Sequence, residues 1–78
     1  MNVEQAIRKA ADTAGKSLNA VSREVGKNDN YLSVTFGRGS VPKADTLAQL
    51  ANACGYRLAL LPAGTDAPGA IVIDPPAE

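Results

Sequence analysis

The side chains of this chain that could carry reactive chemistry are few and scattered. Histidine is absent, which excludes the usual Cys/His zinc site and most acid–base chemistry near neutral pH. Cys54 is the only cysteine, so no internal disulfide can form, and its apolar helical spacing favours a core role. The acids Asp12, Glu24 and Asp45 have no catalytic pairing. We therefore expect no catalytic residue, no metal, no cofactor and no enzyme.

A second set of polar residues is concentrated in one place. Within SLNAVSREVGKNDNYLSVTF (17–36), one Lys, two Asn and one Asp open a short segment with helical spacing. Residues 1–61 carry a net charge of +3 and residues 62–78 a net charge of −3. The basic part points to an anionic partner, but an excess this small is explained equally well by ordinary solvated surface charge.

Four amphipathic segments account for most of the chain. Asn2, Ser17 and Asn28 are positioned to cap the first three, and glycines follow the apolar patterns at their ends. The predicted helices cover residues 3–14, 18–25 and 43–54, with a third helix that Asn28 caps and that runs to about residue 36.

The pattern changes after Gly55. Two short apolar runs, 56–61 and 70–73, flank an eight-residue loop of turn formers and predict a pair of strands. The expected fold is mainly α, with four to five short helices and a C-terminal β-hairpin. It divides into a helical domain (1–55), C-terminal strands (56–74) and a frayed tail (75–78).

The second and third predicted helices meet the requirements of a tight helix-turn-helix. The first of the pair needs a small residue where the second crosses it, and the turn needs a residue that can take a positive φ. Ser22 and Gly26, four residues apart, supply these features. The apolar anchors are Val21, Val25 and Leu32. This is the spacing of a DNA-binding helix-turn-helix.

Residues 3–55 resemble the phage Cro/repressor-type helix-turn-helix family, also called XRE-like or lambda-repressor-like. The supporting features are the Ser22–Gly26 pair, the exit loop GRGSVP (37–42) and the following helix ADTLAQLANACG (44–55). The sequence departs from the family pattern at three positions. Lys27 and Thr35 stand where apolar residues are usual, Phe36 being expected to pack in place of Thr35, and Lys43 replaces a Ser or Thr cap.

The resemblance implies that the N-terminal residues of the third helix enter the major groove of DNA. Asn can pair with adenine, Lys can donate to guanine and Asp can accept from cytosine. By position, the base-facing residues would be Lys27, Asn28, Asp29, Asn30 and Ser33. Phosphate contacts, which set register, would come from Lys16, Ser17, Tyr31, Arg38, Ser40 and Lys43. Helix capping and plain surface charge are the alternative for these residues. For Tyr31, contact with a thymine methyl group and simple packing are two further alternatives.

The C-terminal strands carry more apolar surface than so small a domain easily covers. A lone hairpin is marginal in water, and some relatives in this family dimerise through C-terminal strands. The resemblance implies a two-fold dimer matched to a palindromic site. Its contact residues would be Tyr56, Leu58, Leu60, Ile71 and Ile73. A hairpin folded back on its own helices in a monomer is the alternative.

The function expected from these features is sequence-specific binding of double-stranded DNA by a homodimeric regulator, a repressor that blocks polymerase. The alternative is a protein-interaction module, such as an antitoxin that holds a toxin, with DNA binding secondary. The longest uncharged apolar run, LALLPAG (58–64), is far too short to span a bilayer, and the N-terminus has no apolar signal-peptide centre. We therefore expect a cytoplasmic protein without membrane association.

Overall fold

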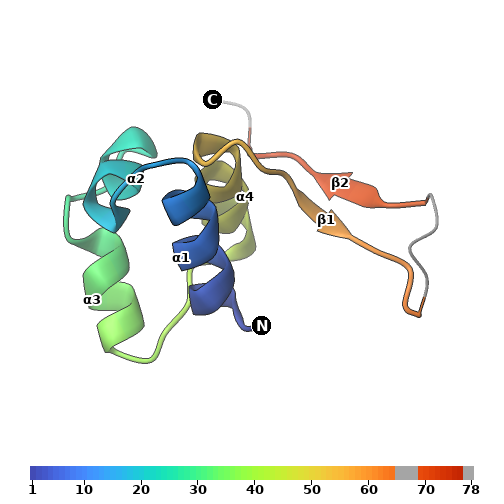
Figure 1. Cartoon of the computed structure of the whole chain (residues 1–78), viewed down its shortest axis with the longest axis horizontal. Helices are drawn as coiled ribbons and strands as arrows, with labels where there is room; N and C mark the ends of the chain where they lie inside the picture. The colour runs from blue at the N-terminus through green and yellow to red at the C-terminus, as the bar shows by residue number, and fades with distance from the viewer. Residues whose placement is uncertain (65–68, 77–78) are drawn as a thin grey trace.

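The computed structural model describes residues 1–64 and 69–76. Four helices are followed by a two-stranded antiparallel sheet, which confirms the predicted mainly-α fold with a C-terminal hairpin (Figure 1). The elements are α1 (Val3–Thr13), α2 (Leu18–Glu24), α3 (Tyr31–Gly37), α4 (Ala44–Ala53), β1 (Leu58–Leu60) and β2 (Ile71–Ile73). Parts of the predicted loop (65–68) and tail (77–78) lie outside the described residues. Across the described residues, no helix has the length and apolar character needed to cross a membrane.

The first two helices begin at the predicted caps. Asn2 and Gln5 form a capping box, in which the Asn2 side chain accepts from the Gln5 N–H at 2.8 Å and the Gln5 side chain accepts from the Asn2 N–H at 3.0 Å. The Ser17 hydroxyl accepts from the Ala20 N–H at 3.0 Å. Each cap satisfies an amide that has no partner within its helix.

The predicted start of the third helix is wrong by two residues. Asn28 does not cap α3, because the helix begins at Tyr31 and its N-cap position is Asn30, whose side chain makes no capping hydrogen bond. The Asn28 carbonyl instead accepts from the Tyr31 N–H at 3.0 Å within the preceding turn. Residues 27–30 therefore form the approach to the helix.

The core lies among the four helices. Leu32 of α3 and Leu50 of α4 are fully buried, as is Val21 of α2, and α1 contributes Ile7 and Ala11. Phe36 is also buried, as predicted from the departure at Thr35. On α4 the predicted apolar face is confirmed, although Leu47 at its edge is only half-buried.

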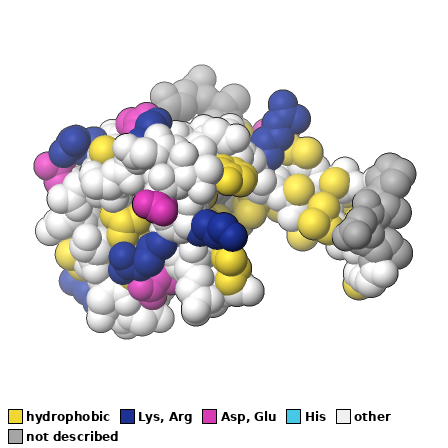
Figure 2. All heavy atoms as spheres, viewed as in Figure 1, with side chains coloured by type: hydrophobic (Ala, Val, Ile, Leu, Met, Phe, Trp, Pro, Cys, Tyr) yellow, Lys and Arg dark blue, Asp and Glu magenta, His cyan; other side chains and the backbone are white. Residues whose placement is uncertain are grey.

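The hairpin projects away from the helices (Figure 1). Both strands are shorter than predicted, and β1 begins at Leu58 because the Tyr56 N–H is used to end α4, donating to the Ala51 carbonyl at 2.8 Å. The strand pairs are Leu58↔Ile73, Ala59↔Val72 and Leu60↔Ile71. Since directly opposed residues share a face, four large aliphatic side chains lie on one side of the sheet. Figure 2 shows apolar side chains gathered along the hairpin, whereas the helical part mixes bases and acids.

Candidate nucleic-acid interface

The turn between α2 and α3 is built from backbone hydrogen bonds around one glycine. Gly26 has a φ of 79°, which an L-residue rarely adopts. The Gly26 N–H donates to the Arg23 carbonyl and the Lys27 N–H to the Ser22 carbonyl, both at 3.0 Å. This pair of bonds is a Schellman motif, and it ends α2 abruptly. The predicted role of the turn glycine is confirmed.

Ser22 joins the two helices. It is fully buried, and its hydroxyl donates to the Leu18 carbonyl at 2.8 Å and accepts from the Leu32 N–H at 3.3 Å. That amide lies in the first turn of α3, where a capping side chain would normally serve it. A side chain of α2 therefore does the work of an N-cap for α3, and this explains why the helix begins without a cap of its own.

The outward side of α3 forms one continuous surface with the turn before it. Leu32 and Phe36 face the core, so the opposite side of α3 points away from it. Ser33 and Val34 lie on that outward side, three and four positions after Asn30. We define the reading face as Lys27, Asn28, Asp29, Asn30, Ser33 and Val34, all of which are exposed. It contains every residue for which base contact was predicted.

Two charged residues of this face have partners within the chain. The Arg23 guanidinium donates to the Asp29 carboxylate at 3.2 Å, and the Lys27 ammonium lies 5.4 Å from the centre of the Tyr31 ring. Both members of the ion pair are exposed, so the pair contributes less than about 1 kcal/mol to stability. Its more important effect is that it holds the Arg23 guanidinium beside the reading face and partly neutralises the Asp29 carboxylate there.

The predicted phosphate contacts divide into two groups. Arg38, Ser40 and Lys43 are exposed around the link between α3 and α4, and their side chains make no hydrogen bond to residues 1–64 or 69–76. Lys16, by contrast, donates to the Glu24 carboxylate and to the Ala53 carbonyl, both at 2.8 Å. A phosphate at Lys16 would therefore have to replace two internal acceptors.

The other two residues in that prediction also make internal contacts. The Ser17 hydroxyl is the cap of α2. Tyr31 is half-buried and packs against the core, which is the alternative that the sequence left open for it.

Sequence reasoning missed two residues at the edge of this surface. Val34 is 38% exposed on the outward side of α3, where contact of its apolar side chain with water does not stabilise the fold. Arg23 was passed over because nothing in its local sequence indicates the bond to Asp29, six positions later. The position of Val34 was the available signal, since it falls four residues after Asn30.

Cys54 behaves as a core residue. It is buried at the C-terminal end of α4. Burial raises the pKa of its thiol above the ordinary value of 9.0; the Lys16 ammonium acts in the opposite direction and the Glu24 carboxylate adds to the rise. The thiol is therefore protonated at neutral pH and a poor nucleophile.

No family model, no curated protein and no solved structure matches this chain. The geometry of the reading face therefore carries the functional argument without a relative to support it.

Proposed function

We propose that this chain is a sequence-specific DNA-binding regulator of the Cro/repressor helix-turn-helix type, a repressor that binds a palindromic operator as a homodimer and blocks polymerase. The observation that carries the proposal is the reading face on α3, whose exposed polar side chains are presented by a helix fastened to α2 through Ser22. The regulator is proposed to act in the cytoplasm, where it meets the DNA it reads.

The side chains of the reading face suit the edges of bases in the major groove. The Asn28 and Asn30 amides each offer a donor and an acceptor, the pair that adenine requires, and the Lys27 ammonium can donate to guanine. Val34 adds an apolar contact of the kind made with the thymine methyl group. Because the Asn30 side chain makes no capping bond, it is free to make such a contact.

Phosphate contacts are proposed for the residues around the link between α3 and α4. The Arg38 and Lys43 charges lie at the two ends of that link and have no acid bound to them in the described part of the chain. Cations at this place would hold the backbone on either side of the groove and fix the register of α3.

A second candidate function is the holding of a partner protein, as an antitoxin holds a toxin. The observation that favours it is the exposed apolar hairpin, in which Leu60 and Leu61 are largely accessible to water. In this function DNA binding is secondary, and the hairpin is the partner's contact.

The experiment that tests the proposal is selection from random double-stranded DNA by the purified full chain at moderate salt. A palindrome with half-sites about 10–10.5 base pairs apart is the expected product. Absence of any enriched sequence contradicts the proposal and turns the search to a protein partner.

A further inference from the structure

An exposed arginine in the last turn of α2 is joined to the approach to α3. The Arg23 Nη1 donates to the Asp29 Oδ2 at 3.2 Å, and both side chains are accessible to water. The turn at Gly26 lies between the two residues in the sequence. The bond therefore brings a cation of α2 beside the reading face, in which Asp29 stands between Asn28 and Asn30.

A second exposed ion pair differs from the first in its origin. The Arg8 Nε donates to the Glu4 carboxylate at 2.9 Å, four positions away within α1, and helical spacing alone puts such residues side by side. No helical repeat brings Arg23 and Asp29 together, because their contact depends on the turn that sets α3 against α2. Exposed pairs contribute little to stability. Neither helix spacing nor stability therefore explains the Arg23–Asp29 pair.

The bond to Asp29 leaves most of the Arg23 guanidinium available. A guanidinium carries its N–H donors in a planar fork, and Asp29 accepts from Nη1 only. The Nε and Nη2 groups make no hydrogen bond to residues 1–64 or 69–76. Together they form the edge of the fork that matches the O6 and N7 acceptors of guanine in the major groove. Because Asp29 already holds the side chain, less conformational freedom is lost when that edge binds.

Charge favours a base edge over a phosphate as the partner of this fork. The Asp29 carboxylate offsets the Arg23 charge, so the pair as a whole gains little from the counterions that a phosphate contact releases. A guanine edge carries no net charge and is recognised by the direction of its acceptors. Arg38 and Lys43 have no acid bound to them among residues 1–64 and 69–76, and they are better suited to phosphate.

We propose that Arg23 reads a guanine and that Asp29 is the positioning residue that orients it. The inference rests on the proposed function, because it requires α3 to lie in the major groove. It adds a residue of α2 to the reading face and predicts a G·C pair at one position of each half-site. Direct acceptance from a cytosine amino group by Asp29 is the alternative, and it gives Arg23 no part in base preference.

The test measures the affinity of the purified full chain for its selected operator by fluorescence anisotropy. Each guanine of a half-site is replaced in turn by 7-deazaguanine, which lacks N7, and in a matched set by inosine, which lacks only the minor-groove amino group. At one position, 7-deazaguanine should weaken wild-type binding at least about fivefold, and inosine should not. Arg23→Ala should bind the guanine and 7-deazaguanine operators alike.

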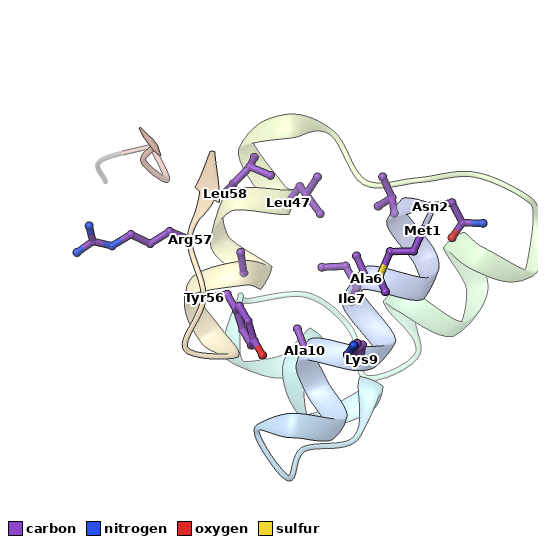
Figure 3. Close-up of a pocket in the computed structure, with 12 residues that line it drawn as sticks. Met1, Asn2, Ala6, Ile7, Lys9, Ala10, Leu47, Tyr56, Arg57 and Leu58 are labelled. Carbon is purple, nitrogen blue, oxygen red and sulfur yellow. The ribbon is translucent and has the colours of Figure 1, made fainter. Parts of the chain in front are cut away.

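Two other arginines provide matched controls. Arg8→Ala removes the arginine of the other exposed pair, on α1. Arg57 lines an apolar groove of about 550 Å³ between α1, α4 and the start of β1, and its side chain extends away from that groove (Figure 3). Among the described residues, the lining of the groove and the reading face share none. Both control variants should therefore keep the wild-type sensitivity to 7-deazaguanine.

Asp29→Asn tests the positioning role, since it keeps the shape of the side chain and removes its charge. It should reduce the discrimination between guanine and 7-deazaguanine. It should also strengthen binding to random DNA, because the Arg23 charge is no longer offset. A merely structural role for Asp29 would not move these two quantities in opposite directions. Wild-type discrimination in Asp29→Asn contradicts the positioning role.

The outcomes separate this inference from the proposed function. A selected operator that is insensitive to 7-deazaguanine at every position overturns the inference alone, as does an Arg23→Ala protein that keeps the wild-type sensitivity. An Arg23→Ala protein that binds all sequences more weakly, with a salt slope smaller by about 1, indicates a phosphate contact and also overturns it. Failure of the wild type to select any sequence overturns the proposed function, and this inference with it.

Discussion

The helical part and the hairpin of this molecule differ in how completely they bury their apolar side chains. The four helices cover a core in which Val21, Leu32 and Leu50 have no contact with water. In the described residues after Gly55, no side chain reaches that degree of burial, and Leu60 and Ile71 are mostly exposed. The helical part is therefore stabilised by its own packing, whereas the hairpin depends on a surface outside its own sheet.

The two parts also differ in how their polar groups are satisfied. In the helical part, a buried hydroxyl and several backbone bonds fix the angle between α2 and α3. The hairpin is held by three residue pairs and by the contact of β1 with α4. A rigid reading face and an adaptable dimer contact are the roles that this difference supports.

The largest expected effect distinguishes the stability contribution of the helical core from that of the hairpin. Leu32→Ala should lower the free energy of unfolding by about 2–5 kcal/mol, because it opens a cavity at a fully buried position. Ile71→Ala should change it by less than about 0.5 kcal/mol when measured on the monomer, since Ile71 is already largely hydrated. Urea denaturation at low protein concentration measures both, and similar losses would contradict the division.

The next effect concerns the bridge between α2 and α3. Ser22→Ala removes the acceptor of the buried Leu32 N–H and should cost about 1–3 kcal/mol of stability. Ser33→Ala is the control, since Ser33 is exposed on the same helix. Thermal unfolding monitored by circular dichroism compares them. A Ser22→Ala protein as stable as the control would show that packing alone fixes the helix pair.

A smaller effect should appear in the salt dependence of DNA binding. Arg38→Ala should weaken all sequences alike and reduce the slope of log K against log salt concentration by about 1. Arg57→Ala, which removes a charge from the hairpin part, should leave the slope unchanged at protein concentrations where the dimer is complete. Equal changes in slope would mean that the DNA contact is not confined to the helical part.

The smallest effect is a pH dependence of the core. The pKa of Cys54 is raised in the folded protein, so the unfolded thiol ionises first as the pH rises past 9.0, and folding loses stability there. The stability difference between the wild type and Cys54→Ala should therefore narrow as the pH rises through 9.0. A constant difference would mean that the thiol titrates alike in both states.

The elements that the sequence predicted well are those with local signals. Asn2 and Ser17 act through amides three residues away, and Gly26 acts within its own turn, so their roles follow from short stretches of sequence. The apolar anchors of the core were predicted for the same reason, because helical spacing alone places them on one face.

The elements that could not be predicted depend on residues distant in sequence. The start of α3 is set by a hydroxyl ten positions before Leu32. That bond cannot be inferred until the helices have been placed in space. The late start of β1 is different, because the Tyr56–Ala51 bond belongs to a local glycine motif at the end of α4. The exposed residues of the reading face were predicted by position, but the internal contacts of Lys16 and Arg23 were not.

The assignment of DNA reading to α3 is tested most directly by comparing two Asn→Ala variants on the selected operator. Asn30→Ala removes an exposed amide of the reading face that makes no capping bond, and Asn52→Ala removes an exposed amide of α4. Fluorescence anisotropy should show Asn30→Ala weakening specific binding by about 1–3 kcal/mol and tolerating a changed base at one position of each half-site, with Asn52→Ala unchanged. Wild-type affinity and wild-type base preference in Asn30→Ala would contradict the assignment of DNA reading to α3.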